Sequence, residues 1–215
     1  MFISFEAGEG AGKSTQARLL VEGLRAAGHD VIHTREPGGS PLAEELRSFV
    51  VQGEPDRMDA ITELLIFTAA RRDHIKRTIQ PALDAGKIVV CDRYLGSTHA
   101  LQGAAGVPAD VIDTLHGMFC ELIPDLTVFL QMDGQVALER SLSRLTEAEI
   151  KEGRFEAKGK DFHKEVCRRF EEQCNARPEW QAVDANRSIE DVAARIFAVV
   201  EAHASFPDQP LARAV

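Results

Sequence analysis

Short, nearly continuous apolar blocks alternate with longer amphipathic segments along this 215-residue sequence. The apolar blocks predict buried strands near residues 2–6, 30–34, 87–91, 126–130 and 180–184. Apolar residues spaced three and four apart predict intervening helices, among them 13–27, a short one ending at Val51, 57–85, one from about 135 and one from Ser188. Fully apolar strands separated by helices indicate a parallel sheet covered on both faces. We therefore expect an α/β fold with a five-stranded parallel sheet.

A glycine-dense turn joins the first strand to the first helix. It consists of Ala7, Gly8, Glu9, Gly10, Ala11, Gly12, Lys13, Ser14 and Thr15. Backbone N–H groups in such a loop surround phosphate oxygens, and the helix N-terminus adds partial positive charge. Lys13 is placed to reach the β- and γ-phosphates of a nucleotide, and the Ser14 hydroxyl to hold Mg²⁺. The pattern G-x-x-x-x-G-K-[ST] is matched except at its first glycine, which is Ala7. This predicts a P-loop for ATP and a three-layer P-loop NTPase fold; a chance glycine-rich turn is the alternative.

Composition narrows the range of partners. The chain carries a net charge of −9, which disfavours duplex nucleic acid and anionic membranes as partners. Its four cysteines, Cys91, Cys120, Cys167 and Cys174, show no C-x-x-C spacing, and we expect reduced thiols in a cytoplasmic protein. No apolar run approaches the length of a membrane span. We expect one domain over residues 1–204 and a flexible tail over 205–215.

The third predicted strand ends at Asp92-Arg93. Ligands of parallel α/β sheets bind beyond the carboxyl ends of the strands, where the P-loop, the loop 35–40 and this pair all fall. An acidic residue there orients Mg²⁺ in P-loop enzymes, and an adjacent arginine binds phosphate. The predicted roles are therefore metal binding for Asp92 and phosphate binding for Arg93; a pair that caps the next helix is the alternative.

The long helix 57–85 carries a predicted core stripe. The stripe consists of Ile61, Leu64, Leu65, Thr68, Ile75 and Ile79. Phe67 and Arg71 lie together on a neighbouring face, where a ring and a guanidinium can hold a nucleobase. Periodicity alone favours a peripheral core phenylalanine and a solvated arginine instead.

Several motifs together resemble the bacterial thymidylate kinase family. They are Phe5-Glu6 with the P-loop, Thr34 to Gly39, Phe67 to Arg71, Asp92-Arg93-Tyr94 with Ser97-Thr98, Gln102-Gly103, and Pro124 to Thr127. They occur in family order over about residues 2 to 200. The resemblance implies phosphorylation of dTMP to dTDP with Mg²⁺ and ATP, in deoxythymidine nucleotide biosynthesis, by an enzyme that forms homodimers. Ile112, Leu115 and Met118 are candidate dimer contacts, although burial within the monomer explains them equally well.

The resemblance also assigns roles in the acceptor site. It implies that Phe67 stacks on thymine and that Arg71 binds the edge of the base and the acceptor phosphate. Arg93 contacts the transferring phosphates. The remaining acceptor-site residues implied by the family are Glu9 at the deoxyribose, Glu36 and Pro37 around the phosphate, Ser97 and Thr98 near the base, and Gln102.

A catalytic arginine in this family lies either in the P-loop or in the lid. Glu9 and Gly10 occupy the P-loop positions here, so the resemblance implies a lid arginine within about residues 141–160. Arg144 matches best and Arg154 second; Arg154 is equally read as a surface arginine of a charged segment. Leu101 stands where the family usually has Tyr or Phe, which implies weaker discrimination against a 2′-hydroxyl or a different ring in that role.

Two other functions fit parts of the sequence. A related kinase could phosphorylate a different nucleoside monophosphate, which an acceptor panel would separate. A P-loop GTPase switch would need a D-x-x-G loop and an N/T-K-x-D motif, and the sequence contains neither. Motif content therefore favours the kinase.

Overall fold

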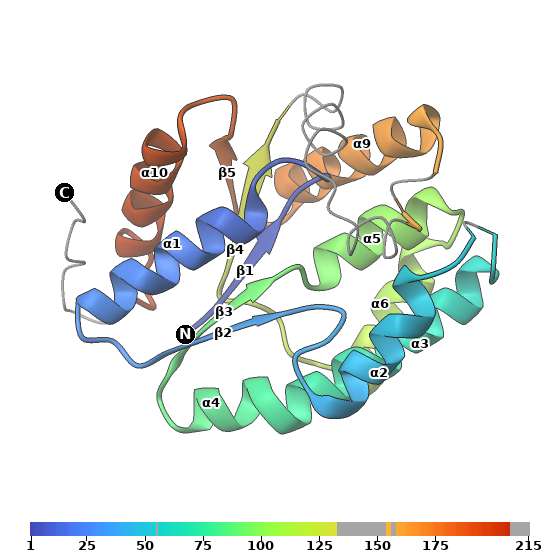
Figure 1. Cartoon of the computed structure of the whole chain (residues 1–215), viewed down its shortest axis with the longest axis horizontal. Helices are drawn as coiled ribbons and strands as arrows, with labels where there is room; N and C mark the ends of the chain where they lie inside the picture. The colour runs from blue at the N-terminus through green and yellow to red at the C-terminus, as the bar shows by residue number, and fades with distance from the viewer. Residues whose placement is uncertain (55, 133–153, 156–157, 207–215) are drawn as a thin grey trace.

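The protein is described here by a computed structural model that covers residues 1–54, 56–132, 154–155 and 158–206. Five parallel strands form one sheet in the order β2-β3-β1-β4-β5 (Figure 1). Their bounds are β1 Phe2–Glu6, β2 Val31–Arg35, β3 Ile88–Asp92, β4 Leu126–Gln131 and β5 Trp180–Asp184. The predicted strands and the predicted fold class are confirmed.

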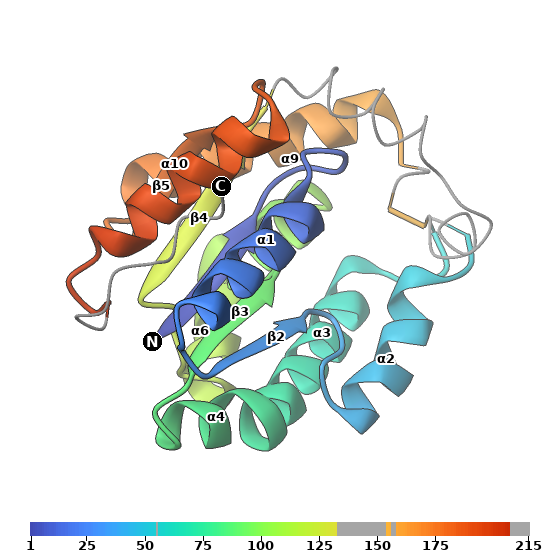
Figure 2. The same cartoon turned by 60° about the vertical axis from the view of Figure 1, so that its left-hand side comes forward.

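Helices cover both faces of this sheet (Figure 2). The helices of the described chain are α1 Lys13–Ala26, α2 Pro41–Val51, α3 Ala60–His74, a π-helix Ile75–Ile79, α4 Gln80–Asp84, α5 Leu95–Ala104, α6 Ala109–Phe119, α9 Lys160–Ala176 and α10 Ile189–Glu201. Side chains alternate along the strands, so Ile3 and Phe5 pack with α1 and α10 while Phe2 packs with α3 and α6 on the other face. The predicted helix near residue 135 and most of the predicted lid lie outside the described residues.

Strand register brings the loops that follow β1, β2 and β3 to one edge of the sheet. Asp92 at the end of β3 is level with Phe5 of β1 and with Arg35 of β2. The backbone N–H groups of Arg93 and Glu36 donate across this edge, to Phe5 O at 2.9 Å and to Asp92 O at 3.0 Å respectively. The P-loop, the loop after β2 and the Asp92-Arg93 pair therefore share one region.

The long predicted helix is interrupted by a π-helical turn and begins later than expected. Asp59 caps α3, and its Oδ1 accepts from the Ile61 and Thr62 amides at 3.0 Å each. This cap satisfies backbone donors of the first turn, which explains a start at Ala60 rather than near residue 57.

The predicted core stripe of this helix is wrong at two positions. Leu64 is buried, but Ile61 and Leu65 are 46% and 51% exposed. Phe67 and Arg71 lie on the buried side with Leu64, so the solvated arginine favoured by periodicity is also wrong. Buried polar side chains occupy part of the inward face, and a hydrophobicity pattern does not register them.

Two of the three candidate dimer contacts pack against the monomer core instead. Ile112 on α6 is 1% exposed and packs in the cluster that contains Tyr94 and Leu64. Leu115 packs against the same cluster, whereas Met118 is 64% exposed. Ile112 and Leu115 are therefore apolar because they lie on the face of α6 that packs against the core.

The loop after β2 needs glycine at position 39. Gly39 has a φ of 81°, and a Cβ there would lie 2.3 Å from His74 Nε2 and 2.4 Å from Thr34 Oγ1. Its carbonyl accepts from Thr78 Oγ1 at 2.7 Å. The loop is thus packed directly on α3 and the π-helix, which positions the residues before it.

Trp180, the single tryptophan of the sequence, lies beneath α5. It is 5% exposed and packs against the rings of Phe129 and Phe170. A Cβ on Gly96 would lie 2.6 Å from the indole, so α5 rests on this ring through its backbone. The aromatic cluster therefore sets the height of α5 above the sheet.

Two features bear on the predictions from composition. Cys91 and Cys120 are buried, while Cys167 and Cys174 on α9 are partly exposed. Within the described ranges, the helices are all too short or too polar to cross a membrane.

Candidate active site

A cavity of about 350 Å³ opens at the carboxyl edge of the sheet. It is lined by Glu9, Lys13, Ser14, Arg35, Glu36, Pro37, Arg47, Val51, Phe67, Arg71, Asp92, Arg93, Tyr94, Ser97, Thr98, Leu101, Gln102 and Phe155. Every residue that was predicted for the acceptor site therefore borders one space. Four other P-loop residues, Gly10, Ala11, Gly12 and Thr15, border a separate hollow of about 50 Å³ with Gln16, Ala185, Arg187, Ile189 and Val192. Arg144 lies outside the described residues.

Lys13 is buried at the base of the P-loop. Its Nζ donates to the carbonyls of Ala7 at 3.2 Å and Gly8 at 3.0 Å. Burial lowers its pKa, the positive charge of Arg93 lowers it further, and Glu9 opposes both effects. Ala7 has a backbone conformation that any residue can adopt, because positive φ among the described non-glycine residues occurs at Arg93 and Glu121. Position 7 therefore does not require glycine. This explains why Ala7 is tolerated in the loop.

Ser14 and Asp92 form an oxygen pair beside the loop. Ser14 Oγ donates to Asp92 Oδ2 at 2.5 Å. Among the described residues, no hydrogen-bond partner faces the buried Asp92 Oδ1. Hard oxygen donors next to a phosphate-binding loop are the ligands that Mg²⁺ prefers, so the residues present fit a magnesium ion held jointly with phosphate oxygens.

Arg93 connects the P-loop to α5. Its backbone has a φ of 69°, which aims the side chain back across the loop. Nη1 donates to Ala7 O at 3.2 Å and to Ser97 Oγ at 3.0 Å, and Nη2 pairs with Glu9. Burial opposes ionisation of Glu9, but Arg93 and Lys13 outweigh it and lower the pKa of that carboxyl. The cavity floor thus holds two cations next to one carboxylate.

Glu6 lies fully buried beneath this group. Its carboxylate accepts from the Tyr94 amide at 2.9 Å and from Ser97 Oγ at 2.6 Å. Burial raises its pKa to about 7, against the opposing effects of the Ser97 hydrogen bond and the charge of Arg93. Glu6 therefore orients the turn from which Arg93 and Ser97 reach the cavity.

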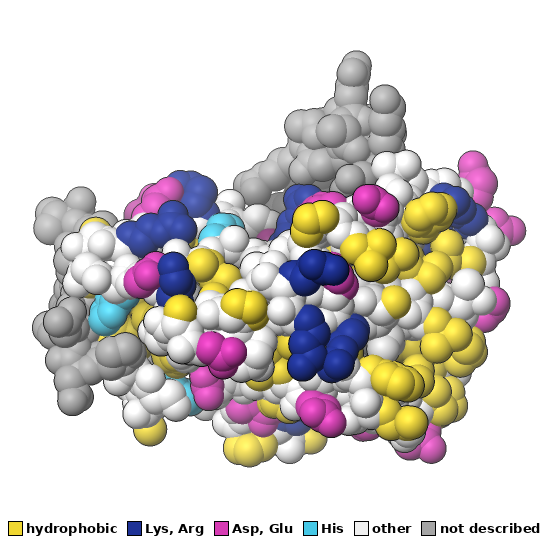
Figure 3. Space-filling model, turned by 90° about the horizontal axis from the view of Figure 1, so that it is seen from below, with side chains coloured by type: hydrophobic (Ala, Val, Ile, Leu, Met, Phe, Trp, Pro, Cys, Tyr) yellow, Lys and Arg dark blue, Asp and Glu magenta, His cyan; other side chains and the backbone are white. Residues whose placement is uncertain are grey.

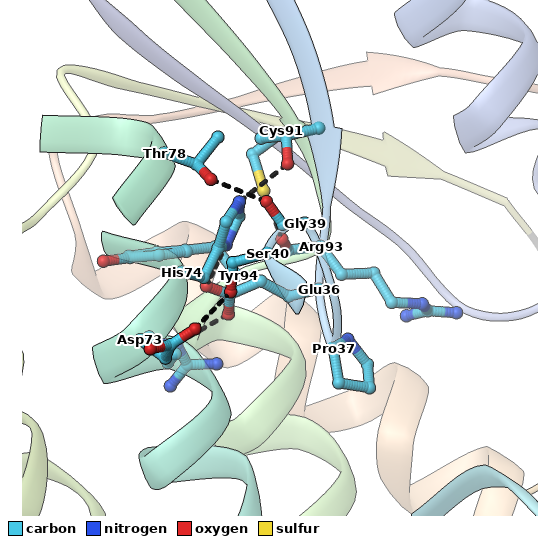
Figure 4. Close-up of polar contacts among 12 residues, drawn as sticks. Glu36, Pro37, Gly39, Ser40, Asp73, His74, Thr78, Cys91, Arg93 and Tyr94 are labelled. Carbon is cyan, nitrogen blue, oxygen red and sulfur yellow. Dashed lines mark hydrogen bonds and ion pairs between the residues drawn. The ribbon is translucent and has the colours of Figure 1, made fainter. Parts of the chain in front are cut away.

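The opposite wall is organised by Glu36. Its carboxylate pairs with Arg71 Nε at 2.7 Å and with His74 Nδ1 at 3.1 Å, and all three side chains are buried. Burial would raise the pKa of Glu36, but the Arg71 charge and the His74 contact lower it overall. In Figure 4, His74 and Glu36 lie close to Tyr94, while Arg93 points away from them.

Arg71 is thereby held in one orientation. Its Nη2 donates to Thr98 Oγ1 at 2.9 Å, and its guanidinium carbon lies 4.9 Å from the centre of the Tyr94 ring. A planar guanidinium with its face on a ring and its edge in a cavity can offer paired donors to an acceptor group. This is the geometry expected for recognition of a base edge or a phosphate.

The part of the cavity between α3, α5 and residue 155 is apolar. Phe67 of α3 packs beside Phe155 in a tilted ring contact, with centroids 6.2 Å apart and planes at 56°, and both rings border the cavity. Val51 and Leu101 complete this part of the lining. Such a slot accepts a flat, mostly apolar group such as a nucleobase.

Arg154 does not lie at the surface, which corrects the reading as a solvated arginine of a charged segment. It is 2% exposed and pairs with Glu63, which is 1% exposed. Its other acceptors are Val50 O at 3.0 Å and Glu54 O at 3.1 Å. Burial of this arginine depends on acceptors far away in the chain, which no local pattern indicates.

Sequence reasoning missed five residues that line the cavity, among them Val51 at the end of α2. Arg35 and Arg47 add positive charge near Glu9 and Pro37, and Arg47 Nη1 donates to Pro37 O at 3.0 Å. Tyr94 and Phe155 add aromatic surface. Tyr94 and Arg35 are direct neighbours of predicted residues, which was a usable signal, whereas Arg47, Val51 and Phe155 are not.

The fold and this site define a class: a protein of the α/β P-loop fold with a cavity next to the loop. The family model described as thymidylate kinase matches residues 5–196. The chain is similar to thymidylate kinases of Ruegeria pomeroyi, at 46% identity over 94% of this chain and 95% of that protein, and of Caulobacter vibrioides, at 46% identity over 93% and 95%. It also resembles a crystal structure of thymidylate kinase from Ehrlichia chaffeensis, with a TM-score of 0.75 and 29% identity over 93% of this chain and 97% of that one. The chain belongs to the thymidylate kinase family, and the resemblance read from its motifs is confirmed.

Proposed function

We propose that this protein transfers the γ-phosphoryl group of ATP, with Mg²⁺, to dTMP and releases dTDP for deoxythymidine nucleotide biosynthesis. The observation that supports this most directly is one cavity that joins the P-loop cations to a Phe67–Arg71 slot. A donor site alone would fit any P-loop protein. The adjoining slot for a flat base favours a nucleoside monophosphate as the acceptor, and family membership favours thymine as its base.

The acceptor is proposed to bind with its base beside Phe67 and its phosphate near Arg93. Arg71, held by Glu36 and Thr98, offers donors to the carbonyl edge of the base or to the phosphate. Arg47 and Arg35 add positive charge on the side of the loop after β2. Glu9 borders the same space and is proposed to face the sugar.

The donor is proposed to bind across the P-loop. Lys13 and the loop amides would hold its β- and γ-phosphates, and Ser14 and Asp92 would hold Mg²⁺, which neutralises phosphate charge when bound. The hollow between the start of α1 and the turn before α10 suits the donor base, because Arg187 and Ile189 border it beside Gly12. None of the residues that border this hollow also borders the larger cavity.

Phosphoryl transfer requires in-line placement and charge neutralisation rather than a strong base. The acceptor phosphate is already ionised at neutral pH and is itself the nucleophile. Lys13 is fixed by carbonyl contacts and Arg93 by contacts with a carbonyl, a hydroxyl and the Glu9 carboxylate, so they would stabilise charge on the transferring group with little reorganisation. A further cation from residues 141–153, proposed to be Arg144, would complete the arrangement.

The test is turnover of an acceptor panel. Purified protein is given Mg-ATP with dTMP, dUMP, dCMP, UMP or AMP, and diphosphate formation is measured. We expect the highest kcat/KM for dTMP and at least a hundredfold lower value for dCMP and AMP. A preference for any other monophosphate would replace dTMP as the substrate while leaving the kinase assignment in place.

We also propose that the protein is a homodimer in the cytoplasm. Exposed apolar side chains gather on neighbouring helices: Ile61 and Leu65 on α3, Met118 and Phe119 on α6, and Ile123 after it. Figure 3 shows hydrophobic side chains gathered toward the side of the molecule where α2 and α3 lie. Burial against a second copy would remove this surface from water. The cytoplasmic location stays a prediction.

A further inference from the structure

Glu63 is a buried carboxylate that the proposed mechanism does not use. It lies on α3, one helical turn before Phe67, and is 1% exposed. Its Oε1 accepts from Gln102 Nε2 of α5 at 2.8 Å, and its Oε2 pairs with Arg154. One side chain thus joins two walls of the cavity to a third segment of the chain.

Arg154 is held on several sides at once. Its guanidinium donates to Glu63, to the carbonyl of Val50 near the end of α2 and to that of Glu54 in the turn after α2. Its backbone N–H donates to Val51 O at 3.4 Å. A buried guanidinium is tolerated only where its charge is paired and its donors are satisfied, which Glu63 and these carbonyls achieve. The position of residue 155 is therefore determined by Arg154.

Phe155 uses that position to border the cavity. It is 7% exposed and packs beside Phe67 at a centroid distance of 6.2 Å. The Arg154 guanidinium carbon lies 5.4 Å and Lys158 Nζ 5.0 Å from the centre of its ring. Two cations and a neighbouring ring hold this phenylalanine in one orientation.

We propose that Glu63 is a positioning residue of the acceptor site, which holds Arg154 and so places Phe155 beside Phe67 as the second ring of the aromatic wall of the base slot. Phe67 supplies the first ring of that wall, and Leu101 offers none. The inference rests on the proposed function, because the base in the slot is that of the acceptor. It gives Arg154 a role that differs from a catalytic cation, since its guanidinium donates to protein acceptors and acts through Phe155.

The two roles predict opposite kinetic signatures. A cation on the γ-phosphate acts in the transition state, so its loss lowers kcat and spares dTMP binding. Loss of a base-slot wall weakens dTMP binding whether or not ATP is present. Direct titration of dTMP into nucleotide-free protein therefore separates them.

The experiment compares the wild type with Phe155→Leu, Arg154→Met and the Phe155→Leu/Arg154→Met double variant. Calorimetric titration gives the dTMP Kd, and steady-state kinetics give kcat and the KM for ATP. We expect the dTMP Kd to rise about tenfold in each single variant, which corresponds to about 1.4 kcal/mol. The KM for ATP should change less than twofold and kcat less than threefold.

The double variant tests whether Arg154 acts through Phe155. If it does, the double variant binds dTMP no more weakly than Phe155→Leu alone, because the ring that Arg154 positions is already absent. The link to Glu63 is tested with Glu63→Gln, which should weaken dTMP binding about as much as Arg154→Met, and with Glu63→Gln/Arg154→Met, which removes both buried charges together and should bind dTMP no more weakly than Arg154→Met. Arg168→Met is the matched control, since Arg168 pairs with Glu165 on the exposed face of α9 and should bind dTMP like the wild type.

Several outcomes would overturn the inference. Unchanged dTMP affinity in a folded Phe155→Leu protein would show that the ring is no wall of the slot. A loss confined to kcat in Arg154→Met would make Arg154 catalytic. Fully additive losses in the Phe155→Leu/Arg154→Met variant would separate the two residues. A wild-type protein that does not bind dTMP would overturn the proposed function and this inference with it, and is recognised before any variant is compared.

Discussion

Lys13 is a buried point charge whose acceptors are loop carbonyls, so its removal tests the donor site with little effect on packing elsewhere. Lys13→Ala should leave the circular dichroism spectrum and the folded state intact and lower kcat at least a hundredfold, about 2.7 kcal/mol of transition-state stabilisation. Coupled-assay turnover at saturating dTMP measures this. Near-normal dTDP formation by the folded variant would falsify the P-loop assignment.

Phe67 tests base recognition at the same scale. Stacking of a base on an aromatic ring contributes roughly 1–3 kcal/mol. Phe67→Ala should therefore raise the KM for dTMP about tenfold and leave the KM for ATP nearly unchanged. Initial rates with each substrate varied in turn give both values, and an equal loss for both substrates would make Phe67 a packing residue only.

Arg144 remains the predicted lid arginine. Arg144→Ala should lower kcat by about a thousandfold, because arginines supplied to related phosphoryl transfers contribute on the order of 10³ or more. The dTMP Kd should stay near the wild-type value, in contrast to that of Arg154→Met. Single-turnover kinetics measure the chemical step directly. A near-wild-type kcat in Arg144→Ala would show that another residue supplies the catalytic cation, with Arg140 and the basic residues of 158–164 as the next candidates.

At the scale of elements, Glu6 links the end of β1 to the turn before α5. Its pKa of about 7 lies above the ordinary value of 4.5, so the folded state binds its proton more tightly than the unfolded state does. The stability that this proton contributes is complete below pH 4.5 and is lost as pH rises through 7, a change of about 3 kcal/mol at most.

Glu6→Gln removes that titration and keeps groups that can accept from the Tyr94 amide and donate to Ser97. The free energy of unfolding of the variant, relative to the wild type, should therefore increase between pH 5 and pH 8. Urea denaturation at several pH values, with the exposed-pair variant Arg18→Ala as control, measures this difference. A constant difference across the range would mean that Glu6 does not titrate there.

The elements that could be predicted from sequence are those with local signals. The apolar strands, the P-loop and the Asp92-Arg93 end of β3 follow from short patterns, and their convergence follows from parallel topology. Burial of Arg71 and Arg154 could not be predicted, because it depends on Glu36 and Glu63, which lie 35 and 91 residues away. Ile61 and Leu65 were misplaced for a related reason, since an apolar residue on a helix is equally compatible with a core and with a contact between molecules.

At the scale of the whole molecule, the exposed residues Ile61 and Leu65 test the proposed dimer. Leu65→Glu should convert a dimer to a monomer, because a charge at the centre of an apolar contact is left without a partner. Sedimentation velocity at micromolar concentration measures the mass. Arg18→Glu, on the remote helix α1, serves as the control. A monomeric wild type under the same conditions would contradict the proposal.

Trp180 gives the molecule a built-in optical reporter. Its indole is buried against two phenylalanine rings and supports the backbone of α5, which carries Ser97 and Thr98 into the cavity. Because the sequence contains one tryptophan, emission excited at long wavelength comes from this ring alone. Any displacement of α5 when a nucleotide enters the cavity alters the quenching environment of that ring. A nucleotide that displaces α5 on entering the cavity can thus be followed by intrinsic fluorescence, without a label.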